Sequence, residues 1–221
     1  MSAVLDQFRR HVAGLPDWGG QPQGEEAGAP TAPARWSWAA LGGRLVELSA
    51  DGSVDGGTAL LTPAGAMVGE AQREGEPTAW VTEAGSSFYP PDLAALGIDL
   101  EALAVVRVPE WQAVARAGER LARSGAFGLI VLDLGRRARI APPLQGRLAM
   151  QALRHGTAIL CLTEKSERAA SLGSLISLHA RITRRRRGEN RFATVLTASK
   201  DKRRGPGWVH EEEWHGPPGL R

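Results

Sequence analysis

The sequence predicts an α/β fold in which a doubly wound, mostly parallel β-sheet is flanked by helices. Three observations support this prediction. Several short runs of the chain are almost continuously apolar, which is typical of strands that are buried on both faces. Amphipathic stretches separate these runs, as expected for helices that cross from one parallel strand to the next. The 221 residues, 43% of them hydrophobic, are enough to enclose a substantial core.

Strands and helices are expected to alternate from residue 36 onward. The strands are predicted at residues 45–48, 78–82, 104–108, 127–132 and 157–162. The helices are predicted at residues 64–74, 91–96, 110–124 and 144–155. Thr62 and Pro63 have the residue types of a helix N-cap and a first helical position, so the first of these helices is expected to begin there.

The first 35 residues are predicted to lie outside this domain. Residues 1–15 place Leu5, Phe8 and Val12 at helical spacing, which predicts a short amphipathic helix. This helix could either dock on the rest of the chain or serve as a detachable partner-binding helix. Residues 16–35 are rich in Pro, Gly, Ala and Glu and are predicted to be a flexible linker.

The pattern changes after the fifth predicted strand. Residues 175–183 and 191–197 alternate between apolar and polar side chains, and a basic turn separates them. This pattern predicts an antiparallel basic hairpin at one edge of the sheet. The hairpin completes a predicted domain that spans residues 36–200.

The last segment, residues 201–221, is rich in Gly and Pro and is predicted to be a loose tail. Trp208 and Trp214 lie in this segment, and Trp36 lies where the domain begins. These tryptophans are therefore placed outside the expected core. Exposed Trp often anchors a partner interface, although packing onto the domain is an equal alternative.

The overall charge of +3 conceals an uneven distribution. Residues 181–204 contain ten basic and two acidic residues, a net charge of +8, which leaves the rest of the chain at −5. Such a segment is predicted either to be a solvated hairpin tip or to contact a nucleic-acid backbone or an acidic protein surface. The predicted contact residues are Arg184, Arg185, Arg186, Arg187, Arg191, Lys200, Lys202, Arg203 and Arg204.

Other kinds of site find little support in the sequence. The single cysteine, Cys161, excludes an internal disulfide framework, and its apolar surroundings predict an inert thiol. His210 and His215 flank three glutamates without a second cluster of ligands, so no metal is expected. The sequence shows no secretory signal and no apolar run of membrane-spanning length, so we expect a cytoplasmic protein without membrane association.

In their order along the chain, several segments resemble the core of the RecA recombinase family. Residues 43–48 (GRLVEL) resemble the strand that leads into its phosphate loop, and residues 71–75 (AQREG) the end of the following helix. The family's next strand is resembled by residues 80–83, and its LGVD…NL segment by residues 96–103. Its second nucleotide-binding strand is resembled by residues 121–133, and its basic hairpin by residues 181–191. The resemblance covers about residues 40–200 and implies a RecA-like domain.

The segment at the family's phosphate loop departs from the motif. Such a loop needs glycines that present backbone N–H groups, a lysine for charge, and Ser or Thr to hold Mg²⁺. Residues 49–58 contain no lysine and add two carboxylates. We therefore expect that ATP is not bound in the family's manner and that no cofactor is used. The residues of this degenerate loop are Ser49, Asp51, Asp55, Gly57 and Thr58.

Two further acidic positions match the family's nucleotide site. Asp133 stands where a RecA-like ATPase has an acidic residue near magnesium, and Glu83 where it has a water-activating carboxylate. Without a phosphate loop, both are expected to be relics: Asp133 as a cap for the following turn, and Glu83 as a solvated strand end. The family's two DNA-facing loops are expected to be short here, at residues 135–144 and 164–173.

A RecA-like scaffold without its phosphate loop resembles the ImuA type of accessory protein in SOS mutagenesis. This resemblance implies a non-catalytic adaptor in DNA-damage tolerance by translesion synthesis. Its implied partners are a RecA-type recombinase and an ImuB-like polymerase-family protein, with a DNA backbone as a further option, and it would join the nucleoid when DNA is damaged. The alternatives are a cell-division inhibitor of the SulA type, a divergent ATPase, and an independent DNA-binding module.

Overall fold

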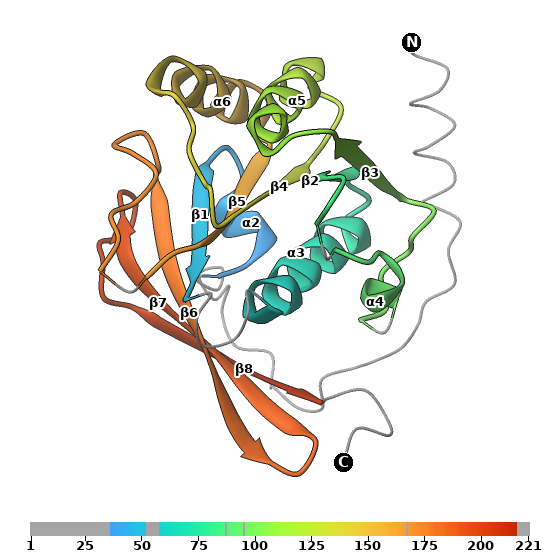
Figure 1. The fold of residues 1–221 in the computed structure, drawn as a ribbon, viewed down its shortest axis with the longest axis vertical. Helices are drawn as coiled ribbons and strands as arrows, with labels where there is room; N and C mark the ends of the chain where they lie inside the picture. The colour runs from blue at the N-terminus through green and yellow to red at the C-terminus, as the bar shows by residue number, and fades with distance from the viewer. Residues whose placement is uncertain (1–35, 52–57, 87, 95, 167, 216–221) are drawn as a thin grey trace, which may run out of the picture.

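The computed structural model describes residues 36–215, except for 52–57, 87, 95 and 167. The predicted N-terminal helix, with Leu5, Phe8 and Val12, and the predicted linker therefore lie outside the described residues. Figure 1 shows that the described part is built around one twisted sheet with helices packed against its two faces.

Eight strands form this sheet in the order β3-β2-β4-β5-β1-β6-β7-β8 (Figure 1). The strands are β1 (Leu45–Ala50), β2 (Thr78–Glu83), β3 (Leu103–Val108), β4 (Leu129–Gly135), β5 (Ala158–Glu164), β6 (Leu178–Gly188), β7 (Arg191–Asp201) and β8 (Val209–His215). The helices are α2 (Trp38–Leu41), α3 (Leu61–Arg73), α4 (Pro91–Ala94), α5 (Trp111–Ser124) and α6 (Pro142–His155), and a short 3-10 helix (Thr58–Leu60) precedes α3.

The pairing of the strands divides the sheet into two parts. The strands β3, β2, β4, β5, β1 and β6 pair with their neighbours in parallel. β7 pairs antiparallel with β6, and β8 pairs antiparallel with β7. The chain thus has an α/β fold with a mostly parallel sheet, as the sequence predicts.

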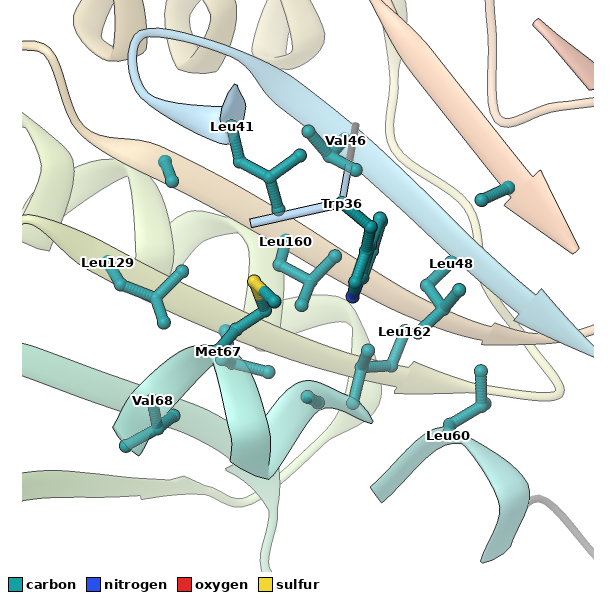
Figure 2. Close-up of a cluster of buried hydrophobic side chains, with 14 of the residues drawn as sticks. Trp36, Leu41, Val46, Leu48, Leu60, Met67, Val68, Leu129, Leu160 and Leu162 are labelled. Atoms are coloured by element: carbon teal, nitrogen blue, oxygen red, sulfur yellow. The ribbon is translucent and has the colours of Figure 1, made fainter. Parts of the chain in front are cut away.

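The central strands are buried on both faces, which explains their nearly continuous apolar runs. In β4, Leu129 packs on the side of α3, whereas its neighbour Ile130 packs on the side of α5 and α6. Figure 2 shows the first of these two cores, in which Trp36 and Met67 lie among leucines of the sheet. Trp36 and Trp208 are only 2% and 4% exposed and belong to this core, so their expected place outside it is wrong.

Two predicted boundaries beside the degenerate loop are wrong. β1 continues through Ser49, which pairs with residues of both β5 and β6, so the strand is longer than its apolar run. α3 begins at Leu61 directly after the 3-10 helix, and its N-cap is Leu60 rather than Thr62. Pro63 is the third residue of the helix, where the backbone N–H has no intrahelical partner in any case.

The predicted loose tail is wrong for most of its length. β7 runs as far as Asp201, and β8 pairs along β7 over residues 209–215. β8 carries three consecutive glutamates and little apolar surface. Such a sequence can still form a strand at the edge of a sheet, because the strand is held largely by its backbone hydrogen bonds to β7. Apolar alternation therefore does not mark it in the sequence. β8, rather than the predicted hairpin, forms this edge of the sheet. Residues 216–221 lie outside the described residues.

Candidate functional site

Three acidic side chains gather where the parallel strands end. β2 ends at Glu83, β4 carries Asp133 near its end, and β5 ends at Glu164. These residues line a cleft of about 240 Å³, which we call the carboxyl edge. In open α/β sheets, ligands bind outside the carboxyl ends of the strands. The structure thus brings together Glu83 and Asp133, the two acidic positions selected from the sequence.

Asp133 anchors the loop that follows β2. The hydroxyl groups of Thr82 and Ser86 donate hydrogen bonds to its Oδ2, at 2.9 and 3.0 Å. Burial raises the pKa of the Asp133 carboxyl, these two hydrogen bonds lower it, and the nearby Glu164 and Glu83 raise it further. Asp133 lies within β4 and bonds across to β2, so its predicted role as a cap for the following turn is replaced by a contact between strands.

Basic side chains only partly balance the charge of the carboxyl edge. Arg136 Nε donates to Glu164 Oε2 at 2.8 Å, and Arg137 also lines the cleft. Three carboxylates therefore face two guanidinium groups across this small cleft. A net negative charge in such a site repels a polyphosphate.

The residues of the degenerate loop are distributed over different environments. Ser49 is a buried residue of β1, and Asp51 follows that strand in a half-buried position. Thr58 is the first residue of the 3-10 helix. Asp55 and Gly57 lie outside the described residues.

A buried polar network beside β1 was not predicted from the sequence. Glu47 has no exposed surface and accepts hydrogen bonds from Lys165 Nζ at 2.6 Å and Thr163 Oγ1 at 3.0 Å. Its other carboxylate oxygen accepts the Leu172 N–H at 2.7 Å. Burial alone would raise the pKa of Glu47, but the hydrogen bonds from Lys165 and Leu172 lower it below its usual value. A single glutamate inside an apolar strand is the signal that could have indicated this network.

His179 connects β1 to the antiparallel part of the sheet. Its Nε2 lies 2.7 Å from Ser49 Oγ, and its Nδ1 lies 2.9 Å from Ser199 Oγ. Because the Ser199 hydroxyl donates to the His179 carbonyl, we assign the ring proton to Nδ1 and the acceptor role to Nε2. Burial lowers the pKa of His179 despite the nearby Glu47. The serine lies beside histidine without exposure or a carboxylate at Nδ1, so this is a structural bridge rather than a hydrolytic site.

Asp201 joins the two ends of the described chain. Its Oδ1 accepts from Arg44 Nη2 at 2.6 Å, and its Oδ2 accepts from Trp208 Nε1 at 3.0 Å. The Arg44 and Asp201 side chains are 2% and 0% exposed. Burial would raise the pKa of Asp201, but hydrogen bonds from the Arg203 N–H, Arg44 and Trp208 bring it below its usual value. This ion pair links the residue before β1 to the end of β7.

The predicted basic residues fall into two separate groups. Arg184–Arg187 and Arg191 lie at the far end of β6 and β7, where Figure 1 shows the strands extending past the helices. Lys200 and residues 202–204 lie at the opposite end, beside Asp201. Lys200 comes nine positions after Arg191 along β7, which corresponds to about 30 Å of extended chain. We call the first group, with residues 192–194 of β7 and 211–215 of β8, the distal ribbon.

One face of the distal ribbon combines arginines with aromatic rings. Arg186 lies opposite Phe192, and Phe192 lies opposite Trp214, so the three side chains share a face. The guanidinium of Arg184 stacks 3.8 Å from the centre of the Phe192 ring. Trp214 Nε1 donates to Thr194 Oγ1 at 2.8 Å, which fixes the indole on this face. An arginine beside an aromatic ring is suited to stacking as well as to phosphate contact.

The other face of the distal ribbon carries both charges. Arg185 and Arg187 point to this side, and Arg187 forms an ion pair with Glu211 of β8. All four of Arg184–Arg187 are exposed. The ribbon therefore presents cations on both faces, with Arg187 already paired. Its five arginines share the ribbon with three glutamates of β8, of which Glu212 lies opposite Thr194 and Glu213 opposite Ala193.

The second basic group is bound to the body of the protein. Lys200 Nζ donates to the carbonyls of Gly173 and Ser174, both at 3.2 Å, and Lys202 Nζ donates to the Ser174 carbonyl at 2.7 Å. Arg203 Nη1 donates to the Gly42 carbonyl at 3.2 Å. Carbonyl partners fix the position of these cations without neutralising their charge.

Comparisons with known proteins assign no family to this fold and these sites: no family model matches the chain, and no curated protein matches it. In the part of the chain that the structure describes, no three His, Cys, Asp or Glu side chains lie close enough together to hold a metal ion. None of the described helices is both long and apolar enough to cross a membrane. Cys161 is fully buried, and burial raises the pKa of its thiol.

Proposed function

We propose that the chain is a non-catalytic, RecA-like adaptor in SOS-induced DNA-damage tolerance, where it binds a RecA-type recombinase and an ImuB-like polymerase-family protein. The RecA-like assignment rests on the order of the resembling segments in the sequence. A mostly parallel sheet with helices on both faces is the architecture that such an assignment requires.

The observation that carries the proposal is the charge at the position where a nucleotide would sit. Glu83, Asp133 and Glu164 meet at the carboxyl edge, and residues 49–58 provide no lysine. Asp133 already accepts two hydroxyl donors from its own chain. A site of this kind favours a scaffold role over phosphoryl transfer, which depends on cations around the phosphates.

The distal ribbon supports the binding part of the proposal. Its arginines are exposed, and Arg184 is ordered by the Phe192 ring rather than by a carboxylate. Such side chains release condensed counterions when they contact a nucleic-acid backbone. The same geometry fits an acidic protein surface. The ribbon is therefore the part of the molecule to which we assign contact with an anionic partner.

The proposal is tested by capture of a purified RecA-type recombinase on the immobilised chain, with and without single-stranded DNA. We expect the recombinase to be retained, and retention to fall when Arg184, Arg185 and Arg186 are all replaced by Gln. A matched variant with Arg116, Arg120 and Arg123 of α5 replaced by Gln carries the same change in charge and is expected to retain it. No retention under either condition would overturn the proposal.

One second candidate has an observation of its own: an independent DNA-binding module that uses the distal ribbon. It predicts salt-dependent binding to single-stranded DNA without any protein partner. A divergent ATPase instead predicts a saturable thermal shift with Mg-ATP, and a division inhibitor predicts capture of the FtsZ division protein. A flat Mg-ATP titration and an empty FtsZ capture exclude these two.

A further inference from the structure

Three exposed apolar side chains lie together on the outer side of α6. Met150, Leu153 and Leu175 are 55%, 73% and 39% exposed. A Cβ placed on Gly146 would lie 3.8 Å from Leu175 Cδ1, so Leu175 lies against the helix at that position. Gly146, Met150 and Leu153 follow one another by four and three residues and so form one stripe along α6. We call this stripe, with Leu175, the α6 surface.

The packing of α6 does not require this second apolar stripe. Leu148 and Ala152 bury the opposite side of the helix against the sheet. The amide of Gln145 further fixes α6, because its Nε2 donates to the carbonyls of Ile140 and Leu172, both at 2.8 Å. An amphipathic helix of a globular domain needs one apolar face, whereas α6 has an additional one on its exposed side. Clustered exposed apolar side chains of this kind mark interaction sites.

The rim of the α6 surface is basic. Lys200 and Lys202 are both bound to the carbonyl of Ser174, the residue before Leu175. At the other end, a Cβ on Gly43 would lie 3.7 Å from Arg203 Nη2 and 3.9 Å from the Cα of Leu153. Arg154 is exposed on the last turn of the helix. Cations held in place around an apolar centre lose little side-chain entropy when they meet an anionic partner.

We propose that the α6 surface is a docking site for an acidic amphipathic helix of another protein. The spacing of the apolar side chains suits a helix that presents residues at i, i+3, i+4 and i+7. Glutamates or aspartates that flank such residues would face Lys200, Lys202, Arg203 and Arg154. This inference does not depend on the proposed function, because it uses none of the residues of the carboxyl edge or the distal ribbon.

Charge and side-chain type favour an acidic helix over three other occupants of the α6 surface: a nucleic-acid strand, the N-terminal segment of this chain and a second copy of the chain. A nucleic-acid strand would place its phosphates over an apolar centre formed by Met150, Leu153 and Leu175, which offers no exposed aromatic ring for stacking. The N-terminal segment, predicted from the sequence to be an amphipathic helix, contains Arg9 and Arg10, which have the same sign of charge as the rim. A second copy would bring the same cations together.

The test measures binding of a fluorescein-labelled helical peptide of about 20 residues, with leucines at i, i+3, i+4 and i+7 and glutamates elsewhere. Fluorescence anisotropy compares it with a scrambled peptide and with a version in which lysine replaces glutamate. We expect the acidic amphipathic peptide to bind at least about tenfold more tightly than either control. Replacing Met150 and Leu153 together by Gln should weaken binding about tenfold or more, and Lys202→Glu should weaken it and reduce its salt dependence.

The control variant is Val209→Gln, which changes an equally exposed apolar residue on β8 and should leave the affinity unchanged. Each replaced side chain is exposed, so we expect all variants to fold. Their melting curves check this. Equal binding of the acidic and scrambled peptides, or an unchanged affinity of the Met150 and Leu153 variant, overturns the proposal. The proposal is also overturned by either of two other results. One is that binding of a single-stranded oligonucleotide depends on Met150 and Leu153 while binding of the peptide does not. The other is that self-association of the chain, measured by sedimentation, depends on these residues while binding of the peptide does not.

Discussion

The carboxyl edge and the distal ribbon both gather charged side chains, but they hold them in opposite ways. At the carboxyl edge, Asp133 is half-buried and bonded to hydroxyl groups of β2 and its loop, and Glu164 is paired with Arg136. In the distal ribbon, Arg184–Arg187 are exposed at the far end of an extension formed by β6, β7 and β8, and only Arg187 among them forms an ion pair with a carboxylate of the ribbon. The charged groups of the carboxyl edge bond to other side chains of the fold, whereas most arginines of the distal ribbon are presented to solvent.

This difference indicates where an anionic partner can gain binding energy. An anion at the carboxyl edge would meet like charges in a small cleft, whereas one at the ribbon would meet cations that have not lost their hydration to burial. We therefore expect contact with an anion at the antiparallel strands rather than at the ends of the parallel strands. The predictions below break or sharpen this comparison, in order of expected effect.

The largest effect is expected from Asp201→Asn, which breaks the junction between the parallel and antiparallel parts of the sheet. The substitution leaves the Arg44 guanidinium buried without its anion, which costs about 3–5 kcal/mol. Urea denaturation should show this loss in the free energy of unfolding. Glu189→Gln at the turn between β6 and β7 is the control and should change stability by less than about 0.5 kcal/mol.

The same ion pair predicts a dependence of stability on pH. Because the pKa of Asp201 is lowered in the folded state, its contribution is fully present above the pKa of an unfolded aspartate, about 3.9. It is lost as the pH falls through the folded pKa. The difference between wild type and Asp201→Asn should therefore shrink in this acidic range. A difference that stays constant into strong acid would contradict the assignment.

The second effect concerns binding rather than stability. Replacing Arg184, Arg185 and Arg186 by Gln should lower the affinity for single-stranded DNA about tenfold or more at low salt. The slope of log K against log salt is negative, and its magnitude should decrease by about 2, because each of the three lost phosphate contacts removes about 0.7. Anisotropy titrations at several salt concentrations measure both. The matched α5 variant, with Arg116, Arg120 and Arg123 replaced by Gln, should behave as wild type, and equal losses in the two variants would assign the effect to net charge alone.

A smaller effect is expected from Trp214→Phe, which tests whether β8 orders the ribbon. The substitution keeps the ring opposite Phe192 but removes the hydrogen bond to Thr194 Oγ1, at a cost of about 1 kcal/mol. Hydrogen exchange of the β7 and β8 amides should become faster near this pair, and the parallel strands should be unaffected. Unchanged exchange in β8 would show that the indole does not hold the strand.

The smallest effect is expected from Asp133→Asn at the carboxyl edge. Because burial raises the pKa of this carboxyl, the folded state holds its proton more tightly than the unfolded state. The stability of the wild type therefore falls as the pH rises from the pKa of the unfolded carboxyl through that of the folded one. An amide oxygen can still accept from Thr82 and Ser86. Stability at pH 7 should therefore rise by at most about 1 kcal/mol, and the gain should vanish below the unfolded carboxyl pKa. A clear loss at pH 7 would mean that the charge itself is needed.

The parallel strands could be predicted from the sequence because burial on both faces leaves an apolar run, as in the Leu129–Gly135 strand. The edge strand β8 could not, because Glu211–Glu213 reads as a solvated segment and only pairing with β7 shows it to be a strand. The resemblance to the phosphate loop predicts that Ser49 lies in a loop, whereas it lies in β1 and its hydroxyl is hydrogen-bonded to His179. A hydrogen bond between residues far apart in the chain leaves no local pattern in the sequence from which it could be predicted.

The candidate site shows the same limit. Glu83 and Asp133 could be selected through their resemblance to acidic positions of the RecA family's nucleotide site, and the strands bring them to one cleft. Arg44 and Asp201 are 157 residues apart, and no periodicity connects them. The sequence predicts the basic residues as one contact set, whereas the structure divides them into a distal set and a set bound to the body of the protein, because of the length and register of β6 and β7.

The central claim, that anions bind at the distal ribbon and not at the carboxyl edge, is tested most directly by a residue-resolved NMR titration. The ¹⁵N-labelled chain is titrated with a single-stranded oligonucleotide and, separately, with Mg-ATP. We predict saturable shifts of the amides of Arg184–Arg187, Phe192 and Trp214 with the oligonucleotide, and no saturable shift of Glu83 or Asp133 with Mg-ATP. Saturable shifts at Glu83 and Asp133 with Mg-ATP, or an unresponsive ribbon, would contradict it.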